Sequence, residues 1–176
     1  YISEFGRGIT DRYGDSVGAK ASADGSLMWP SYIALDKDGN VYVADEWLNR
    51  ISIFTGDGEW IGKWGTPGDR DGEINCPSGL AFGADDNLYL VDSRNNRVQV
   101  FTKEGKFLFT WGRSGSGDGE FSAPWGIDID QHGDVYVADW RNDRMQKFAP
   151  DGRFLLQFGT SGQGDGEFNR PTGVAV

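Results

Sequence analysis

The sequence predicts an all-β protein built from repeated four-stranded antiparallel sheets, and three observations support this fold class. The 176 residues include 27 glycines, about twice the usual ~7% share, which indicates many turns. Residues recur at a constant interval of 47, most visibly Pro30, Pro77, Pro124 and Pro171. Each interval holds short runs of β-branched and aromatic residues between turn residues, without helical periodicity. A four-stranded sheet repeated at this length is typical of a β-propeller blade.

The four strands expected in each interval are clearest in its third copy. The first strand is expected over 126–129 and ends before the turn at 131–134. The second and third strands follow over 135–138 and 144–148, on either side of the polar residues 140–143, and the fourth covers 154–158. Glycine, aspartate, asparagine and proline bound each run, as strand-and-turn patterns require.

The second strand of each interval indicates how the sheets pack. Residues 41–44, 88–91 and 135–138 are apolar on both faces of the strand, so each sheet must be covered on both sides. We therefore expect full blades over 30–64, 77–111 and 124–158. Residues 1–6 are expected to form the outer strand of a preceding blade, and residues 171–176 the inner strand of the next one.

A recurring motif makes this sequence resemble the NHL-repeat family. The third copy carries it as Pro-Trp-Gly-Ile-Asp-Ile-Asp at 124–130, Gly-Asp-Val-Tyr-Val-Ala-Asp at 133–139 and Asp-Arg-Met at 143–145. The other copies depart from it slightly, with Tyr32 in place of glycine and Gly83 in place of aspartate. The resemblance implies a six-bladed propeller, which needs more residues than the 176 present. We therefore interpret 1–176 as one partial propeller, completed by blades of the same longer chain or otherwise by self-association.

Charge and composition exclude several classes of partner. The chain has 17 Lys and Arg against 27 Asp and Glu, a net charge of −10, which disfavours nucleic acid and anionic membranes. No apolar run approaches the ~18 residues of a membrane span, so we expect a soluble protein. The single cysteine, Cys76, excludes an internal disulfide. The compartment stays open, with an extracellular or periplasmic location slightly favoured over the cytoplasm.

Charged residues that recur in every interval are expected to be structural. The pairs are Asp45 with Arg50, Asp92 with Arg97 and Asp139 with Arg144. In each pair the aspartate ends the second strand and the arginine begins the third, so the guanidinium can bond the carboxylate and nearby carbonyls. The Gly-Asp-Gly-Glu linkers supply two carboxylates each, which is too few for a calcium site.

The residues present do not indicate catalysis. The sequence contains no nucleophile motif or phosphate loop, and its only histidine, His132, lies in an expected turn. The resemblance implies that enzymes of this group hold a metal at the axis, as in amidating lyases and calcium-dependent lactonases. Asp128 is the candidate axial ligand, because the other inner strands carry alanine there. We expect no cofactor, with calcium as the alternative if this is a segment of such an enzyme.

Binding is the remaining function, and we expect it on the face formed by the linkers and the second-to-third-strand connections. Aromatic and arginine residues typical of interaction hot spots fall there and vary between copies. They are Trp29, Tyr32, Trp47, Arg94, Trp125, Trp140 and Arg141. The linker arginines Arg70, Arg113 and Arg170 stand among more numerous carboxylates, so a protein, peptide or glycan ligand is expected rather than RNA. The first linker also carries an insertion from Ile9 to Ala23.

Overall fold

The structure is a computed structural model, which describes residues 7–8 and 24–176. Three four-stranded sheets make up most of it. The first sheet contains β3 (Pro30–Leu35), β4 (Val41–Asp45), β5 (Arg50–Phe54) and β6 (Trp60–Trp64). The second contains β7 (Pro77–Phe82), β8 (Leu88–Asp92), β9 (Arg97–Phe101) and β10 (Phe107–Trp111). The third contains β11 (Pro124–Ile129), β12 (Val135–Asp139), β13 (Arg144–Phe148) and β14 (Phe154–Phe158).

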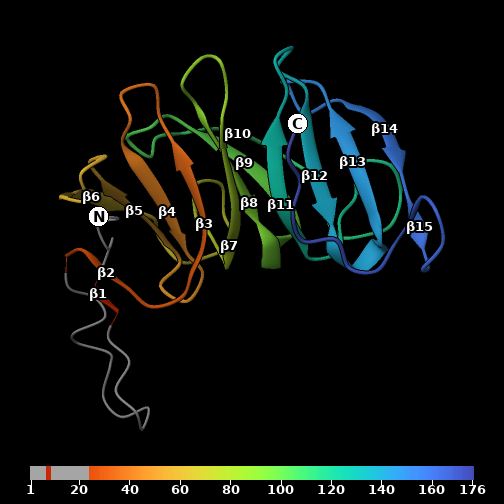
Figure 1. Ribbon diagram of the computed structural model, residues 1–176, viewed down its shortest axis with the longest axis horizontal. Helices are drawn as coiled ribbons and strands as arrows, with labels where there is room; N and C mark the ends of the chain where they lie inside the picture. The colour runs from red at the N-terminus through yellow and green to blue at the C-terminus, as the bar shows by residue number, and fades with distance from the viewer. Residues whose placement is uncertain (1–6, 9–23) are drawn as a thin grey trace, which may run out of the picture.

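Each sheet is an antiparallel meander whose strands follow one another in chain order. The three sheets stand side by side, from orange β3 through green β7 to blue β12 (Figure 1). The sequence-based prediction of an all-β propeller with four-stranded antiparallel blades is therefore confirmed. Short 3-10 turns, η1 (Ser93–Asn95) and η2 (Trp140–Asn142), connect the second and third strands of the last two blades.

The core lies between neighbouring blades, and the second strands contribute to it from both faces. In β8, Leu88 and Leu90 pack toward the first blade, while Tyr89 and Val91 pack toward the third. This alternation explains why these strands are apolar throughout, because a strand between two sheets has no solvent-facing side.

The inner strands of adjacent blades approach one another closely. A Cβ atom added to Gly79 in β7 would lie 2.5 Å from the carbonyl oxygen of Trp125 in β11. The Ser78 hydroxyl donates to that same carbonyl over 2.9 Å, and the Ser31 hydroxyl donates to the Pro77 carbonyl over 2.9 Å. Small side chains at these positions therefore let one blade pack against the backbone of the next.

The linkers over 65–76, 112–123 and 159–170 fold into similar glycine-rich loops. The last one pairs β15 (Thr160–Ser161) in parallel with β16 (Glu167–Phe168). Before the first blade, β1 (Arg7–Gly8) also pairs in parallel with β2 (Ser26–Leu27). The linkers over 65–76 and 112–123 keep single parallel bridges at the equivalent places. The predicted strand at 1–6 and the insertion from Ile9 to Ala23 lie outside the described residues.

Residues 171–176 differ from expectation, because no strand is assigned to them. They still lie against β11, since the backbone N–H of Val176 donates to Asp128 over 2.8 Å. A Cβ atom on Gly126 would lie 2.5 Å from the Thr172 carbonyl oxygen. The segment thus takes the place of an inner strand, but no strand among the described residues pairs with it. Within the described part of the chain, no helix is long and apolar enough to cross a membrane.

Candidate binding site on the linker face

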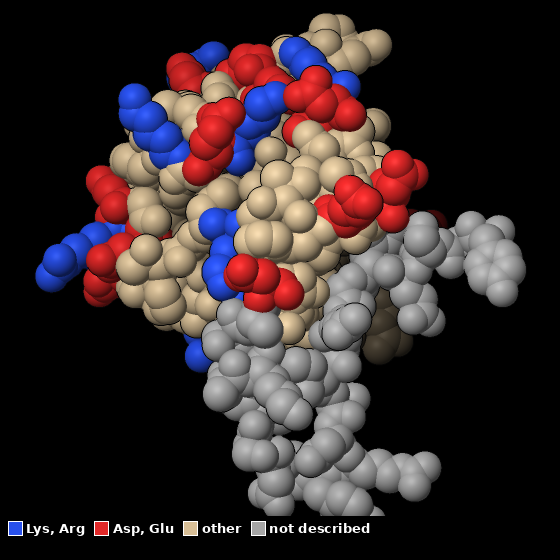
Figure 2. Space-filling model, turned by 90° about the vertical axis from the view of Figure 1, so that its left-hand side faces the viewer, with Lys and Arg blue, Asp and Glu red and all other residues tan. Residues whose placement is uncertain are grey.

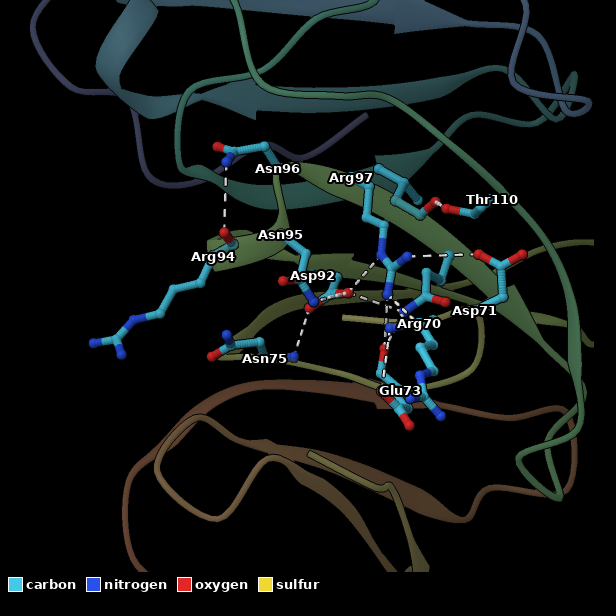
Figure 3. Close-up of polar contacts among 12 residues, drawn as sticks. Arg70, Asp71, Glu73, Asn75, Asp92, Arg94, Asn95, Asn96, Arg97 and Thr110 are labelled. Carbon is cyan, nitrogen blue, oxygen red and sulfur yellow. Dashed lines mark hydrogen bonds and ion pairs between the residues drawn. The ribbon is translucent and has the colours of Figure 1, made fainter. Parts of the chain in front are cut away.

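The aspartate–arginine pair of the second blade holds the linker in place (Figure 3). The fully buried carboxylate of Asp92 accepts a hydrogen bond from Nε of Arg97 over 2.8 Å. The other end of the Arg97 guanidinium donates to the carbonyls of Arg70 and Glu73 over 2.7 and 2.9 Å. Burial raises the pKa of Asp92, although its hydrogen bonds to Asn95, Asn75 and Arg97 act in the opposite direction.

The third blade repeats this network. Nε of Arg144 donates to Asp139 over 2.9 Å, and its Nη2 donates to the carbonyls of Gly117 and Glu120. In the first blade Asp45 and Arg50 are register partners, and Arg50 donates to the carbonyl of Ser26. These contacts support a structural role for the repeated pairs.

Asparagine and glutamine side chains extend the network, and the sequence-based reasoning missed them. The amide nitrogens of Gln99 and Gln146 donate to linker carbonyls over 2.7 Å and to the buried aspartates over 3.0 Å. The amides of Asn95 and Asn142 bridge the same aspartates to Gly68 and Gly115. The interval of 47 between Gln99 and Gln146 was the signal that could have found them.

A second set of side chains ties each blade to the next linker. The side-chain oxygens of Asn49, Asn96 and Asp143 accept the backbone N–H groups of Cys76, Ala123 and Arg170 over 2.6 to 2.8 Å. All six of these residues have positive φ angles between 49° and 61°, a conformation that is uncommon for non-glycine residues other than Asn and Asp. The ties therefore fix the backbone of the face on which the ligand site is expected.

The linker glutamates are used inside their own loops. The carboxylates of Glu73, Glu120 and Glu167 accept backbone N–H groups of Arg70, Gly117 and Gly164 over 2.7 to 3.1 Å. For Glu120, the hydrogen bond from the Gly117 N–H and then that from the Arg113 side chain lower the pKa of the carboxyl group. The carboxylates close the turns of the loop and do not converge on one point.

A cavity of about 340 Å³ lies on the linker face at the seam between the first two blades. Trp29 and Trp47 form its apolar walls and are 63% and 67% exposed. Arg94 lies on the opposite blade, and Glu46 and Cys76 complete the wall between them. Backbone hydrogen bonds hold both sides in place, from Glu46 to the Trp29 carbonyl and from Arg94 to the Asn75 carbonyl.

A second cavity of about 470 Å³ adjoins the first at the seam between the second and third blades. Arg94 and Glu46 line it as well, and Trp125, Trp140 and Arg141 form its far side. The Trp125 and Trp140 rings lie 6.4 Å apart, and the guanidinium of Arg141 stacks over Trp140 at 5.4 Å. The Arg170 guanidinium lies 5.0 Å from the same ring. These cation–π contacts orient the Trp140 indole.

Glu46 and Cys76 form the wall shared by the two cavities, and sequence reasoning assigned neither to the site. The Cys76 thiol donates to Oε1 of Glu46 over 2.9 Å. Oε2 of Glu46 is buried and has no hydrogen-bond partner within residues 24–176. Burial, followed by the hydrogen bond to Glu46, raises the pKa of the Cys76 thiol to about 12. The thiol is therefore protonated at neutral pH, while Oε2 of Glu46 is a buried acceptor without a donor in the described part of the chain.

Six of the seven predicted binding residues line the two cavities, namely Trp29, Trp47, Arg94, Trp125, Trp140 and Arg141. Tyr32 lies apart from these six residues and lines a cavity between the inner strands. Its hydroxyl reaches the carbonyl of Ile127 two blades away over 3.5 Å. A β-bulge between Pro30 and Tyr32 shifts the register there, so side-chain direction could not be read from spacing.

Asp128, the candidate axial ligand, lines the same inner-strand cavity of about 370 Å³. Its Oδ1 accepts the N–H of Ile129 over 2.9 Å, and its Oδ2 accepts that of Val176 over 2.8 Å. Among the described residues no three His, Cys, Asp or Glu side chains gather as a metal site would need. His132 lies in an exposed turn, as expected.

The charges on the surface are mixed in sign. On the side of the first blade, Lys and Arg groups alternate with Asp and Glu groups around a largely uncharged surface (Figure 2). The linker arginines differ in their contacts: Arg113 is ion-paired with Glu120 at 2.9 Å, while Arg170 stacks on Trp140. The side view in Figure 2 thus shows no single-sign field of the kind that a nucleic-acid backbone requires.

Comparison with known proteins supports the fold. A family model described as a six-bladed beta-propeller, DUF5128, matches residues 71–141. A comparison with curated proteins gave no significant match.

Several solved structures share the architecture. Virginiamycin B lyase from Staphylococcus aureus is 19% identical with a TM-score of 0.61, and the match covers 82% of this chain and 44% of the lyase. A gluconolactonase from Xanthomonas campestris is 16% identical with a TM-score of 0.59, and the match covers 86% and 51%. A chain of the nidogen–laminin complex is 22% identical with a TM-score of 0.56, and the match covers 74% and 52%. The chain therefore spans about half the length of these proteins, and what it shares with them is the β-propeller fold.

Proposed function

We propose that this chain is a non-enzymatic binding module of the NHL-repeat type, which holds a protein, peptide or glycan ligand on its linker face. The observation that carries the proposal is the pair of adjoining cavities, whose walls combine exposed tryptophans with arginines. Arg94 and Arg141 have no ion-pair partner among the described residues. Tryptophan and arginine are among the residue types that contribute most of the binding energy at interfaces.

The difference between repeated and variable positions also supports a binding role. The repeated Asp, Arg, Gln and Asn side chains form hydrogen bonds that hold the linkers in place. The cavity walls come from positions that differ between copies, such as Glu46, Ser93 and Trp140. A repeat protein varies such positions on a rigid scaffold to obtain specificity. The structural neighbour from the nidogen–laminin complex is consistent with use of this fold in binding.

A double variant of the linker face tests this proposal. Trp125→Ala with Trp140→Ala removes both rings of the second cavity, so we expect loss of partner capture with an unchanged unfolding transition. Trp60→Ala is the matched control, because Trp60 is an exposed tryptophan on β6 outside both cavities. Capture by the immobilised double variant equal to that of the wild type would contradict the proposal.

The second candidate function is a segment of a metal-dependent propeller enzyme of the lyase or lactonase type. It is favoured by Asp128 in the inner-strand cavity and by the likeness to virginiamycin B lyase and a gluconolactonase. Metal analysis of the purified protein tests it. A stoichiometric metal that Asp128→Asn removes would favour the enzyme over the binding module.

A further inference from the structure

We propose that the ligand of the linker face is an oligosaccharide containing uronic acid. One sugar ring would lie against Trp29 and Trp47, with its hydroxyls at Glu46 and its carboxylate at Arg94. The inference deepens the proposed function and rests on it. It follows from three chemical features that meet in the first cavity and at its shared wall.

The first feature is a pair of exposed indole rings. Trp29 and Trp47 present indole rings to solvent at the edge of the 340 Å³ cavity. The equivalent positions carry Cys76 and Arg94 in the next blade, so blade folding does not need a tryptophan at either place. The C–H face of a pyranose ring is flat and apolar and packs on such a ring, whose N–H stays available to polar groups.

The second feature is a buried hydrogen-bond acceptor that lacks a donor. Oε2 of Glu46 has no partner in the described part of the chain, while Oε1 is bonded to Cys76. An unsatisfied buried carboxylate oxygen is unfavourable until a donor reaches it. Arg94 lines the same cavity and would repel a cationic donor. A neutral hydroxyl group would satisfy Oε2 without adding positive charge, once the Glu46 side chain turns toward the cavity.

The third feature is an unpaired cation beside that acceptor. The side chain of Arg94 extends away from the network around Asp92 and Arg97 (Figure 3). Arg141 lines the adjoining cavity, where its guanidinium stacks on Trp140. Neither Arg94 nor Arg141 is ion-paired with a carboxylate within residues 24–176. A guanidinium binds a carboxylate through parallel hydrogen bonds. Since the chain has a net charge of −10, a short ligand with a carboxylate at Arg94 is favoured over a long polyanion such as a nucleic acid.

A uronic acid supplies all three groups within one ring, namely an apolar face, neutral hydroxyl donors and a carboxylate. A peptide can supply a carboxylate, an apolar ring and hydroxyl or N–H donors as well, but it spreads these groups over several residues. The adjoining cavities, of about 340 and 470 Å³, offer room for consecutive sugar units. An oligosaccharide is therefore the ligand class that the wall chemistry favours.

Calorimetric titration with three defined probes tests this inference. The probes are trigalacturonic acid, a mannuronic acid trimer and a glucuronic acid–containing hyaluronan tetramer, each with its methyl ester as an uncharged counterpart. We expect at least one acid to bind, and its ester to bind about tenfold more weakly, which corresponds to one lost charge-assisted interaction. An acetylated Phe-Glu-Phe-Glu amide serves as the peptide probe.

Three variants locate the site. Arg94→Gln should weaken binding of the acid about tenfold and leave binding of the ester unchanged. Trp47→Ala should weaken acid and ester alike. Arg153→Gln is the matched control, because Arg153 is exposed in the turn before β14 and outside both cavities, and it should change neither.

The outcomes separate this inference from the proposed function. Binding of none of the acids, or acid binding that Arg94→Gln and Trp47→Ala leave intact, would overturn the sugar assignment. Binding of the peptide alone would overturn it as well and leave the binding module standing. If no probe binds and the Trp125→Ala, Trp140→Ala variant also captures partners normally, both proposals are wrong.

Discussion

Replacing Arg97 with methionine tests whether the repeated aspartate–arginine pairs stabilise the propeller. The side chain donates to the buried Asp92 over 2.8 Å and to two linker carbonyls over 2.7 and 2.9 Å. Methionine keeps much of the apolar stem, so the loss reports on the guanidinium. Removing one partner of a buried ion pair costs about 3–5 kcal/mol. Asp92 keeps donors from Asn75, Asn95 and Gln99, so we expect about 3 kcal/mol.

Urea unfolding followed by tryptophan fluorescence measures this change in the free energy of unfolding. A loss of this size lowers the melting temperature by roughly 6–12 °C in a chain of this length. Arg113→Met is the matched control, because its ion pair with Glu120 is exposed, and water and salt screen it. The control should unfold close to the wild type.

The stability lost in Arg97→Met should depend on pH. Without Arg97, the folded-state pKa of Asp92, which burial already raises, rises further. The variant then gains stability relative to the wild type as the pH falls and Asp92 binds a proton. The difference in the free energy of unfolding between the wild type and Arg97→Met should be largest near neutral pH and smaller in acid. Adding Asp92→Asn should restore part of the stability that Arg97→Met loses. A loss below about 1 kcal/mol at pH 7, or a loss independent of pH, would refute the reasoning.

Two further predictions concern the inner strands and the shared cavity wall. Gly79→Ala should lower the free energy of unfolding by about 1–3 kcal/mol, because its Cβ would lie 2.5 Å from the Trp125 carbonyl oxygen. Gly62→Ala is the control, because a Cβ there has no atom within 4 Å. Equal losses of stability in the two variants would contradict the close packing of the inner strands. Alkylation of Cys76 should keep accelerating above pH 9, because burial and Glu46 raise its pKa to about 12. Glu46→Gln should shift the rate profile to lower pH, whereas a wild-type plateau near pH 9 would contradict that pKa.

Much of the fold could be predicted because each blade corresponds to one copy of a sequence repeat. The interval between Pro30, Pro77 and Pro124 defines the blades, and the doubly apolar second strands show that each sheet is covered on both faces. The repetition also predicts a structural role for the aspartates and arginines present in every copy, and the hydrogen bonds of Arg97 and Arg144 to the linkers support it.

The site could be predicted only in part. The variable tryptophans and arginines could be found as deviations from the repeat, and six of them do line the cavities. Tyr32 could not be placed, because a bulge decides its direction. Glu46 and Cys76 were missed because their hydrogen bond joins residues of neighbouring blades, 30 positions apart. Contacts across a seam depend on how the blades pack, which the interval alone does not give.

Hydrogen–deuterium exchange of the protein with and without its captured partner tests the central claim most directly. That claim is that ligands bind at the seams of the linker face. The expected result is increased protection over 46–49, 75–76, 93–96 and 140–143, the segments that line the cavities, with β5, β9 and β13 unchanged. Protection confined to the inner strands around Asp128, with the seam segments unchanged, would contradict the claim and place the site on the axis.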